Sequence, residues 1–256
     1  MAFKKVQTLA AALVCSAALA FAAPAARATT AYDATIQTEV QKKLASKSKL
    51  RDVRASAEDG IVTLNGTVGS LADKLDAGKR AKKVDHVEGV RNALDVAGPV
   101  VEDAKLQDQL ARKLTYDRVG YWNMFDALGV TVQNGVAAVS GVVHDPVAKD
   151  SALATVAHTA GVKDVIERVK VAPTSIFDDD LRLRLARAIY GDSVLGRYAI
   201  DPAKPIRIVV ENGHVGLFGT VDSRMDKQIA ALRANSVFGA FSVDNHLTVA
   251  GEDRVQ

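Results

Sequence analysis

The sequence has only one cysteine, Cys15, so no disulfide can form within the chain. Aromatic residues are also scarce and make up 5% of the 256 positions. The one long apolar run, from Leu9 to Ala23, is shorter than the roughly 20 residues that span a bilayer. A wholly disordered chain is excluded as well, because 48% of the residues are apolar and only 25% are charged.

Motifs that would place a catalytic or metal centre are lacking too. The sequence contains no Gly-x-Ser-x-Gly, no His-Glu-x-x-His and no phosphate-binding loop. Its five histidines are scattered without the spacing of metal ligands. The fragment Gly191-Asp192-Ser193-Val194 resembles the nucleophile block of one esterase group, but its Gly, Asp and Ser residues favour a turn. We therefore expect a non-enzymatic protein with no catalytic residue, no metal and no cofactor.

The first 28 residues have the plan of a secretory signal peptide. Lys4 and Lys5 precede the apolar run, and the small-residue motif Ala26-Arg27-Ala28 follows it. Cys15 is preceded by Val14 rather than by a small residue, which disfavours a lipid anchor at this position. The sequence thus predicts cleavage after residue 28 and a periplasmic location.

The formal charge of +3 belongs to this N-terminal segment. Lys4, Lys5 and Arg27 are its only charged residues, so residues 29–256 carry 30 basic and 30 acidic side chains. A nucleic-acid-binding protein would show a clear excess of basic residues. We therefore expect no nucleic-acid partner.

Three copies of one unit fill the rest of the chain. Each copy has an Asx-Gly dipeptide followed by five residues and a second glycine. These turn glycines are Gly60 and Gly66, Gly135 and Gly141, and Gly213 and Gly219. The apolar residues that follow keep the same register, which identifies repeats at 33–98, 102–172 and 177–250.

The periodicity of each repeat predicts its elements. Apolar residues four positions apart, such as Ile36, Val40 and Leu44, indicate an opening amphipathic helix. Alternating segments then flank the Asx-Gly dipeptide, which suits a two-residue β-hairpin. A second helix with small buried residues leads to a last strand, and a right-handed crossover makes this strand parallel to the second. The expected fold class is α+β, with three tandem αββαβ units, each a mixed three-stranded sheet with two helices on one face.

The repeated motif resembles the BON domain, which is named for bacterial OsmY and nodulation proteins. The matching segments are Leu64 to Val68, Val139 to Val143 and Leu217 to Val221, each followed by a Val-rich last strand. Glu167 departs from the pattern, because the other two copies have Asn92 and Asn245 there. The resemblance implies an exported, non-catalytic protein that binds phospholipid and acts in osmotic or other envelope stress.

One candidate binding surface is basic. Lys79, Arg80, Lys82 and Lys83 lie on the second helix of repeat 1, and three of these side chains share the face opposite its apolar stripe. Near an anionic membrane each would contribute about 1 kcal/mol. Alternatively, they form an ordinary solvated face that nearby acidic residues partly neutralise.

A second candidate surface is aromatic. Tyr116, Tyr121, Trp122 and Phe125 fall within ten residues of one another, before the first strand of repeat 2. Such rings suit a membrane interface or a peptide-binding surface, but they suit a small satellite core equally well. Phe218 stands on the expected uncovered face of the third sheet, either as a contact to a neighbouring repeat or partner, or as a harmless exposed residue.

These observations favour a periplasmic protein that binds anionic phospholipid or envelope surfaces peripherally and supports envelope integrity under osmotic or other stress. The alternative is a periplasmic protein–protein interaction scaffold that docks envelope proteins. The sequence leaves the oligomeric state and the orientation of the three repeats open.

Overall fold

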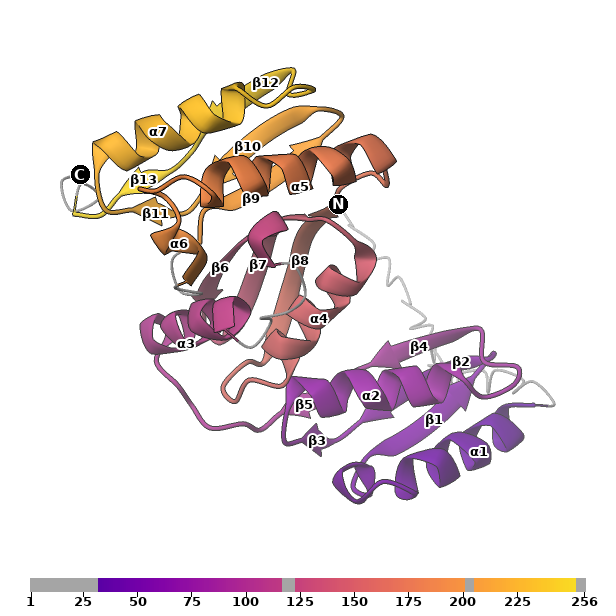
Figure 1. The fold of residues 1–256 in the computed structure, drawn as a ribbon. Coiled ribbons are helices and arrows are strands. Elements are labelled where there is room, and N and C mark those ends of the chain that lie inside the picture. The colour runs from indigo at the N-terminus through magenta and orange to yellow at the C-terminus, as the bar shows by residue number, and fades with distance from the viewer. Residues whose placement is uncertain (1–31, 117–122, 201–204, 252–256) are drawn as a thin grey trace, which may run out of the picture.

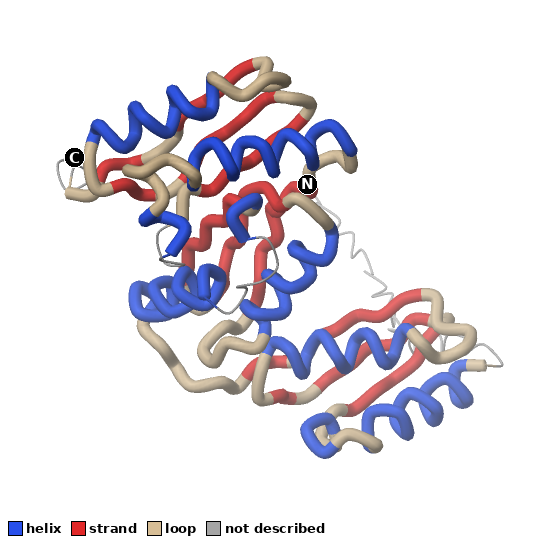
Figure 2. Tube along the Cα trace, in the orientation of Figure 1, coloured by secondary structure: helices blue, strands red, loops and turns tan. Residues whose placement is uncertain are grey.

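A computed structural model describes residues 32–116, 123–200 and 205–251, and it shows three copies of one α+β unit in tandem (Figure 1). In each copy two helices cover one face of a small sheet, as the helix and strand colours of Figure 2 make clear. The predicted fold class is therefore confirmed. The expected signal peptide, residues 1–28, lies outside the described residues.

Repeat 1 extends from α1 to β5. Its elements are α1 (Asp33–Ala45), the 3-10 helix η1 (Ser48–Leu50), β1 (Arg54–Glu58), β2 (Ile61–Asn65), β3 (Thr67–Val68), α2 (Leu71–Lys82), β4 (Gly89–Asn92) and β5 (Asp95–Val96). The central strand β2 pairs antiparallel with β1 and parallel with β4. This is the mixed three-stranded order that the crossover predicts, and the short strands β3 and β5 extend it as a parallel pair.

Repeat 2 has the longest strands. Its elements are α3 (Asp103–Tyr116), the 3-10 helix η2 (Asn123–Phe125), β6 (Ala127–Gln133), β7 (Val136–Val143), α4 (Pro146–Ala157) and β8 (Asp164–Val171). The central strand β7 pairs antiparallel with β6 and parallel with β8 along its full length.

Repeat 3 returns to the pattern of repeat 1. Its elements are α5 (Ile176–Tyr190), α6 (Arg197–Ile200), β9 (Arg207–Glu211), β10 (His214–Phe218), β11 (Thr220–Val221), α7 (Arg224–Asn235), β12 (Ser242–Asn245) and β13 (Thr248–Val249). The sheet order is β12-β10-β9, and β11 pairs in parallel with β13.

An asparagine at the same position in repeats 1 and 3 explains why the last strand of each is divided into two short strands. Asn92 Nδ2 donates to Lys74 O at 2.6 Å while its Oδ1 accepts from Leu94 N at 3.4 Å, and Asn245 makes the equivalent pair of bonds. In repeat 2 the residue is Glu167, which forms an ion pair with a lysine of α4 and lies inside an uninterrupted β8. The Asn in this motif is thus structural, since it fastens the strand to the second helix.

The Asx-Gly hairpins form as predicted. Asp59 and Gly60 have φ angles of 51° and 75°, the positive values that a two-residue turn requires, and the other two hairpins match them. The second glycine is equally constrained. A Cβ on Gly141, whose φ is 124°, would lie 2.0 Å from the carbonyl oxygen of Ala127.

Each hairpin is tied to the first helix of its repeat by an aspartate. The two carboxylate oxygens of Asp33 accept from the backbone amides of both turn residues, Asp59 and Gly60. Asp103 and Asp178 do the same in repeats 2 and 3. The start of helix one and the hairpin therefore form one fixed end of the unit, which we call the tip.

The three hydrophobic cores are linked in series. The predicted stripes of the first helices are buried, and repeat 1 has a core of its own. Leu71, at the start of α2 and fully buried, packs into the core of repeat 2 with Leu106 and Leu110. Phe125 of η2, which is 3% exposed, packs into the core of repeat 3. Each later core thus contains a side chain from the repeat before it.

Candidate binding surfaces

The outward sides of α1 and α2 carry the predicted basic surface. These helices lie side by side because both must cover the apolar face of the sheet below them (Figure 1). Lys79, Lys82 and Lys83 are exposed. Arg80 is half-buried, and its Nε lies 2.7 Å from a carboxylate oxygen of Asp76, one turn earlier.

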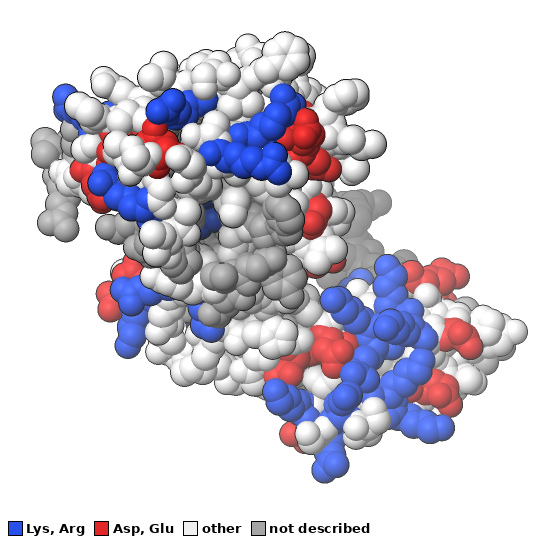
Figure 3. Space-filling model, in the orientation of Figure 1, with Lys and Arg blue, Asp and Glu red and all other residues white. Residues whose placement is uncertain are grey.

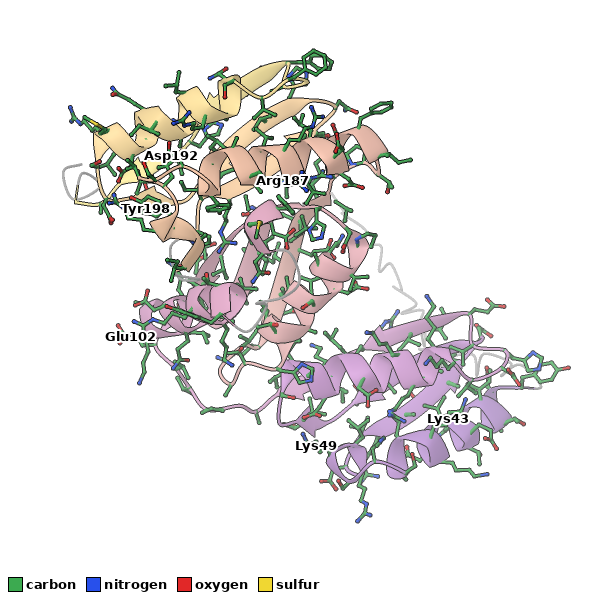
Figure 4. The ribbon with its side chains drawn as sticks, viewed as in Figure 1. Lys43, Lys49, Glu102, Arg187, Asp192 and Tyr198 are labelled. Atoms are coloured by element: carbon green, nitrogen blue, oxygen red, sulfur yellow. The ribbon has the colours of Figure 1, made fainter. Side chains whose placement is uncertain are left out.

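The structure adds four lysines that the sequence interpretation missed. Lys42, Lys43, Lys47 and Lys49, from the end of α1 and from η1, are exposed on the same side of repeat 1. Figure 3 shows Lys and Arg side chains gathered over these helices, and Figure 4 labels Lys43 and Lys49. Lys43 Nζ reaches across to the carbonyl oxygen of Lys83 at 2.8 Å. The basic helix face comprises Lys42, Lys43, Lys47, Lys49, Lys79, Lys82 and Lys83.

Folding separates charges that are nearly balanced in the sequence of this repeat. Residues 33–49 and 71–85, which form the helical layer, hold nine basic and five acidic residues. One of the five, Asp33, is buried and bonded to the hairpin. The strands and loops of the repeat hold three basic and five acidic residues. A repeat of almost neutral composition therefore presents one strongly basic side.

Of the four residues of the predicted aromatic surface, the structure describes Phe125 and Tyr116. Tyr121 and Trp122 lie outside the described residues. Phe125 is buried in the core of repeat 3 and meets the ring of His144 edge-on at 6.3 Å, so it is not available to a membrane or partner. This placement corrects its assignment as a contact residue. Tyr116 is 46% exposed at the end of α3.

The segment before β6 joins repeats 2 and 3. Arg207 of β9 donates from Nη1 to the carbonyl oxygens of Asn123 at 2.8 Å and Asp126 at 3.1 Å. Asp126 is fully buried and accepts from the backbone amide of His144 at 3.0 Å. A second contact between the two repeats is the ion pair of Lys170 with Glu211. Residues 123–126 therefore act as a joint between the repeats.

Phe218 lies on the uncovered face of the third sheet. It is half-buried, and its ring stacks on that of His246 with centroids 4.9 Å apart and planes 17° apart. The ring also covers Gly216, where a Cβ would be 2.6 Å from it. These contacts fall within repeat 3, so they give Phe218 a local packing role beside any contact with a partner.

The longer segment of repeat 3 is held by two tyrosines and an aspartate. Tyr190 donates to the carbonyl oxygen of Ile206, and burial raises the pKa of its hydroxyl well above its usual value. Tyr198 donates to Asp226 Oδ2 at 2.6 Å, and burial raises its pKa too. Burial opposes the charge of Asp226, but bonds from Tyr198 and Ser223 and the Arg197 charge hold its pKa below the usual value.

The serine in the esterase-like fragment sits in a turn. Asp192, the preceding residue, accepts from the backbone amides of Val194 at 2.8 Å and Leu195 at 3.2 Å and forms an ion pair with Arg233. These contacts, the Val194 amide first, lower its pKa. Asp192 thus stabilises the turn rather than orienting a catalytic base, and Ser193 is exposed. Within residues 32–116, 123–200 and 205–251, no cluster of His, Cys, Asp and Glu could hold a metal ion.

Comparisons with known proteins identify the family of the three repeats. The model of the BON domain family matches residues 32–98, 102–173 and 183–251, which is most of the chain. Two solved structures of CdsD, a structural protein of the type III secretion system of Chlamydia trachomatis, align with TM-scores of 0.23 and 13% identity. The alignments cover 83% of this chain and 90% and 96% of the two CdsD chains. No curated protein matches. Among the described helices, none is both long and apolar enough to cross a membrane.

Proposed function

Because the chain belongs to the BON domain family, we propose that it is a non-enzymatic periplasmic protein that binds anionic phospholipid through the basic helix face of repeat 1. Binding of this kind would be peripheral and reversible. Its role would be to support the envelope under osmotic or other stress, as the family resemblance implies.

The observation that supports this proposal is the merging of two sets of lysines on one layer of helices. The three lysines of α2 would contribute about 3 kcal/mol at an anionic surface, which corresponds to millimolar binding. With the four lysines of α1 and η1 the upper limit rises to about 7 kcal/mol. That corresponds to a dissociation constant on the order of 10 μM, which suffices for reversible recruitment.

Nearby acidic groups leave most of this surface unneutralised. Asp76 is engaged by Arg80, which is not among the seven lysines. Asp73 lies 3.8 Å from Lys49, whose side chain is 76% exposed, and a pair with that geometry contributes little. Glu39 and Asp85 also lie in the helical layer, but its basic residues outnumber its acidic ones by nine to five. The layer therefore keeps a net positive charge, and at physiological ionic strength charges within about 8 Å of one another still act together.

Cosedimentation with lipid vesicles tests the proposal. The wild-type chain should bind vesicles of equal parts phosphatidylglycerol and phosphatidylcholine at low salt, and this binding should weaken as salt is added. Changing Lys42, Lys43, Lys79, Lys82 and Lys83 to Gln should abolish most of it. A control variant changes three exposed lysines of repeat 2, Lys105, Lys113 and Lys163, to Gln and should bind normally. Equal binding by both variants would refute the proposal.

A protein-binding role is the second candidate, and one feature of repeat 2 favours it. The uncovered face of its sheet has a shallow hollow near the hairpin, lined by Val136, Ala138, Ile166 and Arg168. Ile166 is 45% exposed there. Recovery of the same envelope protein after crosslinking in cells, and its loss with Ile166→Asp, would support a scaffold.

A further inference from the structure

Four large apolar side chains project into solvent at the tip of repeat 3. The exposed fractions are 85% for Ile176, 86% for Phe177, 90% for Phe238 and 79% for Phe241. These values are unusual for phenylalanine, which is among the most buried residue types. We call this group the apolar tip.

Hydrogen bonds to the backbone hold the three segments of the apolar tip together. Asp178, directly after Phe177, bonds to the amides of both hairpin residues, at 2.8 Å for Asn212 and 2.9 Å for Gly213. The backbone amide of Phe241 donates to Gly213 O at 2.8 Å, and Arg184 donates to the carbonyl oxygen of Phe238. In Figure 1 the start of α5, the β9–β10 hairpin and the loop after α7 meet at one end of the repeat.

The other two repeats show that the fold does not require these side chains. The position of Phe241 is taken by Glu88 in repeat 1 and by Lys163 in repeat 2. The backbone N–H of each donates to the hairpin carbonyl oxygen of its own repeat at 2.9 Å. The positions equivalent to Phe238 are Asp85 and Ala160, from the constant register of the repeats. At these two positions the same backbone thus forms with polar or small residues, so the exposure of Phe238 and Phe241 needs an explanation other than stability.

The chemistry of the apolar tip fits a lipid bilayer better than a protein groove. Four side chains of this size offer on the order of 600 Å². A partner in a stable protein interface buries about 800 Å². Because each ring is highly exposed, the tip is convex. A bilayer accepts protruding side chains of this kind without a complementary pocket.

The charged neighbours of the apolar tip are paired. Arg184 lies 2.9 Å from Asp180, and Arg182 forms an ion pair with Asp179. The tip therefore approaches lipid with little unbalanced charge to desolvate.

We propose that the apolar tip inserts Phe177, Phe238 and Phe241 into the interfacial region of the bilayer, independently of lipid charge. The inference rests on the proposed membrane role, but it concerns a second surface with a different driving force. Transfer of apolar side chains from water is insensitive to the salt that screens the basic helix face. The two surfaces can therefore be tested separately.

A fluorescent probe measures insertion directly. In a Cys15→Ser background the chain has no cysteine, so Phe238→Cys gives one site for an environment-sensitive NBD label. On vesicles of phosphatidylcholine alone, at high salt, the label should shift to shorter wavelength and brighten. The matched control carries the label at Asp85→Cys, the same position of repeat 1, and should stay water-exposed. A label at position 238 that stays in water on protein-bearing vesicles would overturn the inference.

A substitution series separates the two surfaces. Changing Phe177, Phe238 and Phe241 to Ser should weaken binding to phosphatidylcholine vesicles at high salt by about tenfold, with an unchanged thermal midpoint because the side chains are exposed. The lysine variant described above should keep that binding and lose the low-salt anionic component. Unchanged neutral-vesicle binding by the Phe variant would contradict tip insertion and leave the basic helix face intact. Concentration-dependent dimerisation that the Phe variant abolishes would instead assign the tip to a second copy.

Discussion

The carboxylate of Asp178 accepts a 2.9 Å hydrogen bond from the backbone amide of Gly213, 35 residues further along the chain. The same aspartate bonds to Asn212, and it is only 2% exposed. Since its equivalents Asp33 and Asp103 form the same pair of bonds, this contact is a repeated component of the fold. This contact holds together the tip, which carries exposed apolar side chains in repeat 3.

Replacing Asp178 with Asn should destabilise the protein. The amide offers one acceptor where the carboxylate offers two, and it leaves a buried backbone N–H without a partner. We expect the free energy of unfolding to fall by roughly 1–3 kcal/mol. Denaturant titration measures this loss. Asp180→Asn is the control, because it removes only a surface ion pair with Arg184 and should cost well under 1 kcal/mol.

Gly141 and Gly129 provide a second matched pair, on neighbouring strands. Gly141→Ala would place a Cβ 2.0 Å from a carbonyl oxygen at a positive φ, and we expect a loss of about 3 kcal/mol or more. A Cβ on Gly129 would lie 3.9 Å from Ser140 Oγ, so Gly129→Ala should change stability by about 0.5 kcal/mol or less. Thermal unfolding of both variants checks the contrast, and similar midpoints would contradict it.

Phe125→Ala should disturb repeat 3 although Phe125 belongs to repeat 2. Its ring is buried in the core of repeat 3, so truncation should cost about 3–5 kcal/mol. Hydrogen exchange should rise in β9 and β10. Phe218→Ala, which removes a half-buried ring on the uncovered face, should cost less and leave the core amides protected. Exchange that rises only in repeat 2 would show that the joint is not cooperative.

Acid should loosen repeat 3 through Asp226. Its pKa in the folded state is lowered, so the stability that it contributes is present above the unfolded value of about 3.9 and is lost as the pH falls below that value. Asp226→Asn should flatten this part of the stability–pH curve. Urea unfolding of wild type and variant between pH 6 and 3 would show the difference, and parallel curves would count against it.

The repeats, the hairpins and the two-helix layer were predictable because each depends on a local pattern. Asn134-Gly135 predicts its turn from backbone preference alone, and the spacing of Leu106 and Leu110 predicts a buried helix face. Asp103 gave a usable signal that was missed, since an aspartate lies in the first turn of the first helix of every repeat. The pattern did not reveal a functional role for any of these residues.

The surfaces were harder to predict because they combine residues from separate elements. Lys43 and Lys83 share a face only once α1 and α2 lie side by side, although two helices on one face were expected. The choice between core and contact for Phe125 stayed open in the sequence because its partners lie in another repeat. Phe238 drew no attention, since a single phenylalanine gains meaning only beside Phe177 and Phe241.

The linked cores also give the chain a direction. Leu71 completes the core of repeat 2 and Phe125 that of repeat 3, whereas repeat 1 has a core of its own residues. Shortening the chain from its C-terminus therefore leaves the remaining cores whole, while shortening it from the N-terminus removes a side chain from the next unit. Synthesis also begins at the N-terminus, so Leu71 and Phe125 are each made before the repeat whose core they complete.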